Sequence, residues 1–286
     1  MYRANSDDAL VYSTPLGGVD AHIPYQDDRL DDGWNFDKSG EYRLELANTN
    51  PGASGEFEFT LECLGGPCAR TNPDPDGLYA GLSDAELIQA IRQDHAGHQA
   101  LSYDAARDFI FEYNIEENNG RLKCHYTGRE VPAHNRREGQ AQGFDTEHTW
   151  PQSKGAGSSP ARTDMHHLWP IDSNSNSRRS NYDFDNVVSG EEWSEGGSKL
   201  GLNANGDTRF EVRDDHKGNV ARAYFYFSVI YDYPIDDTTE ATLRQWHVAD
   251  PPDESEKHRN NEIEALQHSR NPFIDAPELV DRIADF

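Results

Sequence analysis

Hydrophobic periodicity changes once along this chain of 286 residues, and the change limits the folds that it can adopt. Residues 41–46 and 56–62 alternate polar and apolar side chains, which is typical of strands with one buried face. Turn-forming residues between these two segments favour a hairpin. From Ser83 onward the apolar residues recur with a helical period, beginning at a capping-box sequence that ends at Glu86. The pattern predicts an α+β protein built from two modules.

A stretch rich in Pro and Asp over residues 70–77 predicts a linker between the modules. We therefore expect a small β-rich accessory module over residues 1–76 and a largely helical domain over residues 77–286. The periodicity of the second module places its further helices at about 103–113, at about 219–231 and from near Glu254 onward. We expect the aromatic residues of the 219–231 helix to lie in the core.

The cysteines and the absence of long apolar runs restrict the cellular setting. No run approaches the roughly 18 consecutive apolar residues of a membrane-spanning helix, so no membrane partner is expected. No signal peptide is visible at the start of this sequence. Cys63 and Cys68 flank a turn and could form a local bridge, which would indicate an extracytoplasmic compartment, whereas Cys124 is left over.

Acidic residues dominate the chain, with 52 Asp and Glu against 26 Lys and Arg and a formal net charge of −26. Such an excess opposes the binding of a polyanion. Residues 121–182 differ, because nine basic and six acidic residues give this window a charge of +3 and leave −29 for the rest. One hypothesis is that the acidity is an adaptation to high salt, where carboxylates keep a protein soluble and charge repulsion is screened.

Residues 144–153 and 164–182 form the constellation that carries chemistry, and five of the twelve histidines lie between residues 121 and 182. The two segments predict a strand, a loop, a second strand and a short helix. We expect Pro170 to end the second strand, and Asp172 or Ser173 to cap the helix.

Hydrolysis of a phosphodiester requires a base for water, a hard cation for the developing charge, and cationic donors that orient the phosphate. A neutral histidine suits the first role, and a carboxylate with an amide oxygen suits Mg²⁺. Glu147 and His148 are adjacent, so on a regular strand they would point to opposite faces. Pro151 follows closely and predicts that the strand ends there.

These segments resemble a known family. The runs Glu-His-Thr-Trp-Pro-Gln-Ser (147–153), Asp-Met-His-His-Leu-Trp-Pro (164–170) and Asn-Ser-Arg-Arg-Ser-Asn-Tyr (176–182) resemble the bacterial endonuclease I family. Its members are secreted or periplasmic nucleases with a ββα-metal (His-Me finger) active site. The resemblance spans roughly residues 80–275 and implies a ββα-metal nuclease core within the helical domain and an extracellular or periplasmic location.

The resemblance also implies a role for each matching residue. His148 would be the general base, and Glu147 and Asn176 would be the two protein ligands of Mg²⁺, with Mn²⁺ or Ca²⁺ as substitutes. Arg179 lies three residues after Asn176 and so shares its helix face, which favours it over Arg178 for a role at the site.

The resemblance also suggests roles for one arginine and two histidines near the second strand. The family's phosphate-binding arginine lies in the loop before the second strand, where Arg162 is the candidate. His166 and His167 flank the second strand, and we expect structural roles for both. The implied reaction is cleavage of DNA, with RNA left open as a second substrate, to 5′-phosphate products by a monomer with little sequence preference.

Two alternatives from other classes remain at this point. One is a catalytically silent homologue that binds a ligand or partner through the acidic β module. The other is a zinc hydrolase, suggested by the density of histidines, although no His-Glu-x-x-His pattern occurs in the sequence.

Overall fold

The computed structural model describes residues 2–3, 21–22 and 79–286. The chain divides into two compact units, Met1–Leu61 and Glu62–Phe286. In the first unit, strands β1 (Tyr2–Arg3) and β2 (Ala21–His22) pair in parallel. The remainder of the expected β-rich module, the expected linker and the Cys63–Cys68 pair lie outside the described residues.

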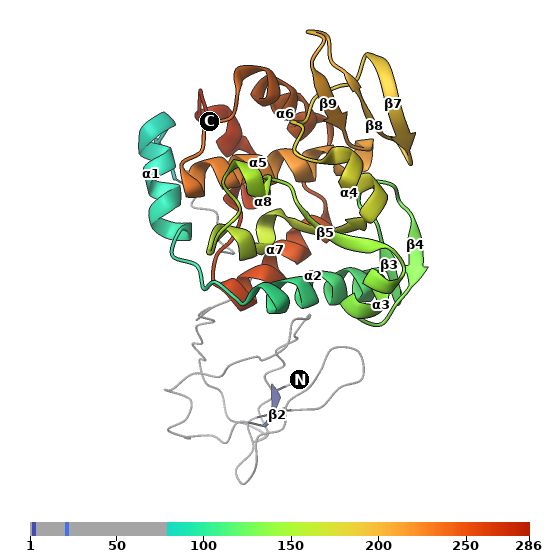
Figure 1. Cartoon of the computed structure of the whole chain (residues 1–286). Coiled ribbons are helices and arrows are strands. Elements are labelled where there is room, and N and C mark those ends of the chain that lie inside the picture. The colour runs from blue at the N-terminus through green and yellow to red at the C-terminus, as the bar shows by residue number, and fades with distance from the viewer. Residues whose placement is uncertain (1, 4–20, 23–78) are drawn as a thin grey trace, which may run out of the picture. The chain divides into compact units, whose positions relative to one another are not determined.

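The second unit mixes helices and short strands, so the predicted α+β class is confirmed (Figure 1). The helices are α1 (Asp84–His95), α2 (Tyr103–Glu117), α3 (Arg136–Ala141), α4 (Ser173–Arg179), α5 (Lys217–Tyr231), α6 (Asp237–Ala249), α7 (Glu254–Gln267) and α8 (Pro272–Asp275). The strands are β3 (Arg121–Lys123), β4 (Glu130–Pro132), β5 (Phe144–His148), β6 (Leu168–Asp172), β7 (Ser189–Glu195), β8 (Ser198–Leu202) and β9 (Thr208–Glu211).

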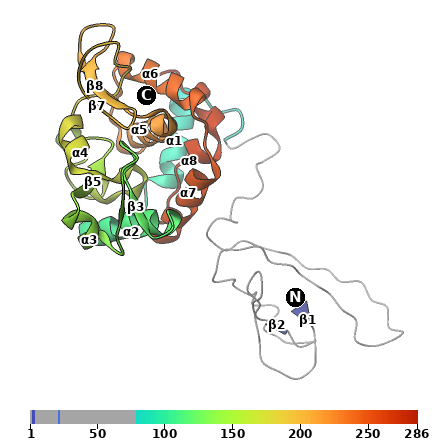
Figure 2. The same ribbon diagram turned by 90° about the vertical axis from the view of Figure 1, so that its right-hand side faces the viewer.

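Helix α5 is the centre of this unit and contacts α1, α6 and α8, as both views show (Figures 1 and 2). It is buried almost all round, from Val220 to Ile230, because its apolar residues fill every face rather than one stripe. The predicted helix at about 219–231 and the placement of its aromatic residues in the core are confirmed. Among the described residues, no helix combines the length and apolarity that crossing a membrane requires.

The predicted helix starts are largely right. Helix α1 begins one residue after Ser83, although the Ser83 side chain makes no capping hydrogen bond. The hydroxyl of Ser102 does cap α2 by accepting a hydrogen bond from the Ala105 amide at 3.2 Å. Helix α2 extends four residues beyond its predicted end, and its last turns bury Asn114 and Ile115.

Strands β5 and β6 form an antiparallel pair, and α4 follows β6 directly, which is the predicted order of strand, loop, strand and helix. Asp172 caps α4 through hydrogen bonds from two backbone amides, as expected. The prediction that Pro170 ends the second strand is wrong, because β6 continues to Asp172. Among the described residues, β6 pairs with β5 alone, so a proline is tolerated where its missing N–H would face away from that partner.

Candidate active site

The β5–β6 pair and α4 bring the predicted site residues to the end of one strand (Figure 1). Strand β5 ends at His148, and Glu147 pairs with Trp169 in the register. Alternation along β5 places Thr146 and His148 on one face of the pair and Glu147 on the other. The two predicted catalytic groups therefore approach the strand end from different sides.

Glu147 is a buried carboxylate with 2% of its surface exposed. Its Oε1 accepts a hydrogen bond from the Tyr126 hydroxyl at 2.8 Å and lies 3.1 Å from Arg179 Nη1. Burial raises the pKa of Glu147, and the Arg179 guanidinium offsets part of that rise. Both donors reach the same oxygen, which leaves Oε2 as the carboxylate oxygen for a further ligand.

Arg179 anchors α4 to the end of β5, and it lies on the same helix face as Asn176, as predicted. Its guanidinium donates to the carbonyl oxygens of His148 at 3.1 Å and Thr149 at 2.5 Å, and it is 1% exposed. The neighbouring Arg178 is exposed. Arg179 therefore holds the carboxylate of Glu147 and the backbone that carries His148 in one arrangement.

His148 is held in a defined tautomer. Its Nε2 lies 3.1 Å from the carbonyl oxygen of Arg162, and a carbonyl can only accept, so Nε2 carries the proton. The remaining nitrogen, Nδ1, is an acceptor that meets only the side-chain amide of Gln152 at 3.4 Å. Burial lowers the pKa of His148 to about 3, with a further contribution from His167. At neutral pH the ring is uncharged, and its Nδ1 lone pair has one weak partner, the Gln152 amide.

Asn176 lies on α4 beside the backbone of β5. Its Nδ2 donates to the Thr146 carbonyl at 3.5 Å, which leaves Oδ1 free to bind a cation. The Oδ1 of Asn176 and the Oε2 of Glu147 are hard oxygen donors, the set that Mg²⁺ accepts while it keeps most of its waters. The residues present thus fit the predicted ion.

Arg162 lies in the loop between the strands, in a 3₁₀ turn over Ala161–Thr163. Its carbonyl orients His148, and its guanidinium carbon lies 4.0 Å from the centre of the Tyr103 ring. Its Nε is buried without a hydrogen-bond partner among the described residues. The structure therefore brings the predicted phosphate-binding arginine next to the predicted base.

His166 and His167 are fully enclosed and bond to the backbone. The Nε2 of His166 lies 3.0 Å from the Ser269 carbonyl, and that of His167 lies 2.7 Å from the Ala161 carbonyl. These contacts fit the structural roles predicted for both. Within the described part of the chain, no three His, Cys, Asp or Glu side chains converge to hold a metal, so a zinc site with three such ligands gains no support.

Sequence reasoning missed several residues that contact this group, among them Tyr103 and Arg107 on α2, Tyr126 after β3, and Gln152 after β5. Tyr103 and Arg107 are four residues apart and share a helix face, which is a signal the sequence contains. Nothing in the sequence indicates that this face would lie against β5.

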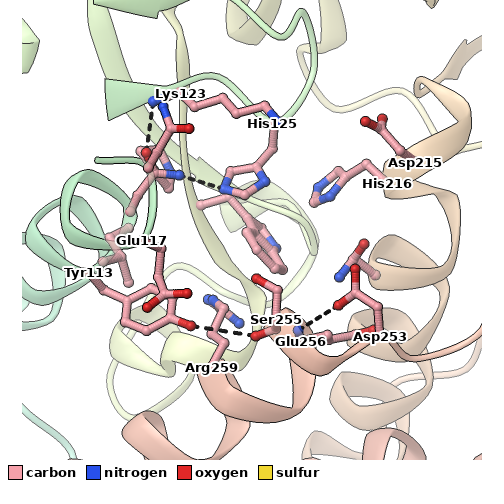
Figure 3. Close-up of a pocket in the computed structure, with 16 residues that line it drawn as sticks. Tyr113, Glu117, Lys123, His125, Asp215, His216, Asp253, Ser255, Glu256 and Arg259 are labelled. Carbon is pink, nitrogen blue, oxygen red and sulfur yellow. Dashed lines mark hydrogen bonds between the residues drawn. The ribbon is translucent and has the colours of Figure 1, made fainter. Parts of the chain in front are cut away.

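A separate cavity of about 210 Å³ lies at the other end of α2 (Figure 3). His125 and His216 line it with ring centres 5.0 Å apart. Arg259 also lines it, and its guanidinium carbon lies 3.8 Å from the centre of the Trp169 ring. None of the predicted catalytic or metal-binding residues lines this cavity. It reaches the β5–β6 pair only through Trp169 and Pro170.

The comparisons with known proteins identify the class as nuclease and then the family. The family model for endonuclease I matches residues 85–278, and the chain belongs to this family. An extracellular ribonuclease of Bacillus subtilis (strain 168) is 33% identical over 255 residues, covering 82% of this chain and 86% of the relative. An extracellular ribonuclease of Bacillus amyloliquefaciens is 35% identical over 265 residues, covering 83% and 87%. The protein is thus a nuclease, as the sequence motifs predicted.

Proposed function

We propose that this protein is a Mg²⁺-dependent endonuclease that hydrolyses DNA and RNA without sequence preference and leaves 5′-phosphate ends. The observation that carries the proposal is the orientation of His148, whose protonated Nε2 is held by a backbone carbonyl while Nδ1 makes one long contact, with the Gln152 amide. A buried, neutral and oriented imidazole is the group that a general base requires.

His148 takes the proton from the attacking water at Nδ1. The imidazolium that forms is held through Nε2–H by the Arg162 carbonyl, and the approach of an anionic phosphate favours that charged state. Arg162 lies next to this base, and its guanidinium donates to the non-bridging oxygens of the phosphate that is cleaved.

Glu147 and Asn176 would hold the metal ion, since a carboxylate and an amide supply the hard oxygen donors that Mg²⁺ accepts. When bound, Mg²⁺ stabilises negative charge on the phosphoryl and leaving oxygens. Arg179 fixes the position of Glu147 and neutralises part of its charge. Because Tyr126 and Arg179 occupy Oε1, the carboxylate cannot rotate freely, and its other oxygen keeps one orientation.

Both nucleic acids are proposed as substrates for two separate reasons. The two relatives are named ribonucleases, which favours RNA for this chain as well. The residues of the site are suited to phosphate rather than to base edges, so the sugar and the base are not selected. The relatives are also named extracellular, and we propose the same location for this protein.

Replacement of the base tests the proposal directly. His148→Ala is expected to lower kcat on supercoiled DNA and on RNA by about 10²- to 10⁴-fold, the usual contribution of a positioned acid–base group. His134→Ala, an exposed histidine outside the site, is the matched control and should retain wild-type rates. If His148→Ala cleaves like the control, His148 is not the base.

Removal of the metal is the second test. EDTA should abolish cleavage of both substrates, and Mg²⁺ or Mn²⁺ should restore it in the wild type. A wild-type protein that cuts neither substrate with Mg²⁺ would instead indicate the catalytically silent homologue.

A further inference from the structure

The side chain of Tyr103, at the start of α2, holds two guanidinium groups beside His148. The guanidinium carbons of Arg162 and Arg107 lie 4.0 Å and 4.9 Å from the centre of the Tyr103 ring. The same ring lies 5.9 Å from the ring of His148. Cations over an aromatic face are held without losing their hydrogen-bond donors, so both arginines keep N–H groups for another partner.

Arg107 has donors that the folded chain does not use. Its Nε donates to Thr146 Oγ1 at 3.1 Å, and its Nη2 forms an ion pair with the Asp145 carboxylate at 3.6 Å, a distance longer than a hydrogen bond. Arg136 offers a comparison, because its side chain has the same 16% exposure. Arg136 donates to two carboxylates of α2, from Nε at 2.6 Å and from Nη2 at 3.0 Å. Among the described residues, Arg107 therefore has a single long ion pair, to a carboxylate that is 51% exposed, and an anionic ligand can add to this pair or replace it.

Arg107 and Arg162 contact different positions along β5. Arg162 bonds to His148 through its carbonyl, whereas Arg107 bonds to Thr146, two residues earlier on the same face. Two residues of a strand span about 7 Å. The two arginines therefore contact β5 at successive positions on one face, and both guanidinium groups lie beside the Tyr103 ring.

We propose that Arg107, positioned by Tyr103, forms a second phosphate subsite, which binds the phosphodiester group next to the one that is cleaved. The proposal rests on the proposed function, since it takes Arg162 and His148 as the place of cleavage. The ligand is one phosphate of a polynucleotide backbone, either RNA or DNA. The subsite gives a strongly acidic protein a fixed, local attraction for a polyanion.

Salt dependence of binding tests the subsite. Binding of a short fluorescein-labelled single strand is measured by anisotropy in EDTA, so that it is not cleaved, over a range of KCl concentrations. Loss of one phosphate contact lowers the slope of log Kd against log salt by about 0.7. Arg107→Gln is expected to show this loss and to bind about tenfold more weakly at low salt. Arg136→Gln, with the same charge change and the same exposure, should keep the wild-type slope.

A single-phosphate substrate separates binding from damage to the site. Bis(p-nitrophenyl) phosphate has no neighbouring phosphate, so it cannot use the second subsite. For Arg107→Gln, the ratio of kcat/KM on the oligonucleotide to kcat/KM on this diester should fall about tenfold relative to wild type. An unchanged ratio or an unchanged salt slope in an active enzyme would overturn the subsite. Inactivity of the wild type on both substrates would instead overturn the proposed function.

Variants of Tyr103 test how the arginines are positioned. Tyr103→Leu removes the ring and should lower the salt slope at least as much as Arg107→Gln does. Tyr103→Phe keeps the ring and should restore the wild-type slope. Equal slopes for the Leu and Phe variants would show that the ring does not position the arginines.

Discussion

Glu147 and Asp164, two carboxylates of the β5–β6 region, are both almost completely buried, but different numbers of their oxygens have hydrogen-bond donors. Glu147 has one oxygen occupied, by Tyr126 and Arg179, and its pKa is raised by burial. Asp164, which precedes β6, has both oxygens filled by neutral donors: the hydroxyls of Tyr226 and Tyr231, the amide of Gln267 and the backbone amide of His166.

The pKa of Asp164 moves the other way. Burial opposes its ionisation, but the neighbouring His166, His98 and His167, together with the Gln267 amide, outweigh burial and hold the pKa below its ordinary value. A carboxylate whose lone pairs are all used ties together the segments that donate to it. Asp164 joins the hairpin to α5 and α7 in this way, whereas Glu147 keeps an oxygen for a ligand. The difference separates a structural carboxylate from the one that we propose as a metal ligand, although both are buried.

The largest effect is expected from Glu147→Gln. The amide retains the shape of the side chain but is a far weaker cation ligand, so cleavage with Mg²⁺ should fall by at least about 10²-fold. Thermal unfolding followed by circular dichroism should remain cooperative, because Arg179 keeps the carbonyls of His148 and Thr149 as acceptors. If the variant retains wild-type activity, Glu147 is not a metal ligand.

Asp164→Asn should instead lower stability strongly and change activity little. It replaces an acceptor oxygen with a donor amide in a fully buried position, which should lower the free energy of unfolding by about 2–4 kcal/mol. Urea unfolding measures this loss. The kcat of the folded variant should stay within about tenfold of wild type, since Asp164 contacts no proposed catalytic group. A stable but inactive variant would show that Asp164 belongs to the active site.

Lowering the pH should reduce the free energy of unfolding through His166, the histidine beside Asp164. Burial lowers the pKa of His166 from 6.5 to about 4, so the unfolded chain takes up this proton first as the pH falls. The free energy of unfolding therefore decreases between pH 6.5 and about 4, by up to about 1.4 kcal/mol per pH unit from this residue. Urea titrations of His166→Gln should show a shallower pH dependence than those of His134→Gln, an exposed control. Equal slopes would contradict this assignment.

The smallest effect is expected from Tyr231→Phe, which removes one of the two hydroxyl donors to Asp164 Oδ2. The neighbouring Tyr226 hydroxyl remains, so the loss should be about 1 kcal/mol in urea unfolding. A loss as large as that of Asp164→Asn would show that the donors act as one network rather than singly.

The candidate site could be predicted where its residues are close in the sequence. Glu147, His148, Asn176 and Arg179 lie in two short motifs, and their spacing implied a strand end and a shared helix face. The structure places them accordingly. Tyr103 and Arg107 could not be placed, because they precede the motifs by about forty residues and reach β5 only through packing of α2.

The sequence alone determined the α+β class, the order of elements around the motifs and the residue types available for phosphodiester chemistry, because periodicity, capping and motif spacing are local properties. The tertiary structure decided which nitrogen of His148 carries the proton, which oxygen of Glu147 is occupied, and that Arg107 has one long ion pair whereas Arg136 has two short ones. These states depend on partners distant in sequence, since a hydrogen bond or an ion pair exists only once two separate segments have packed together.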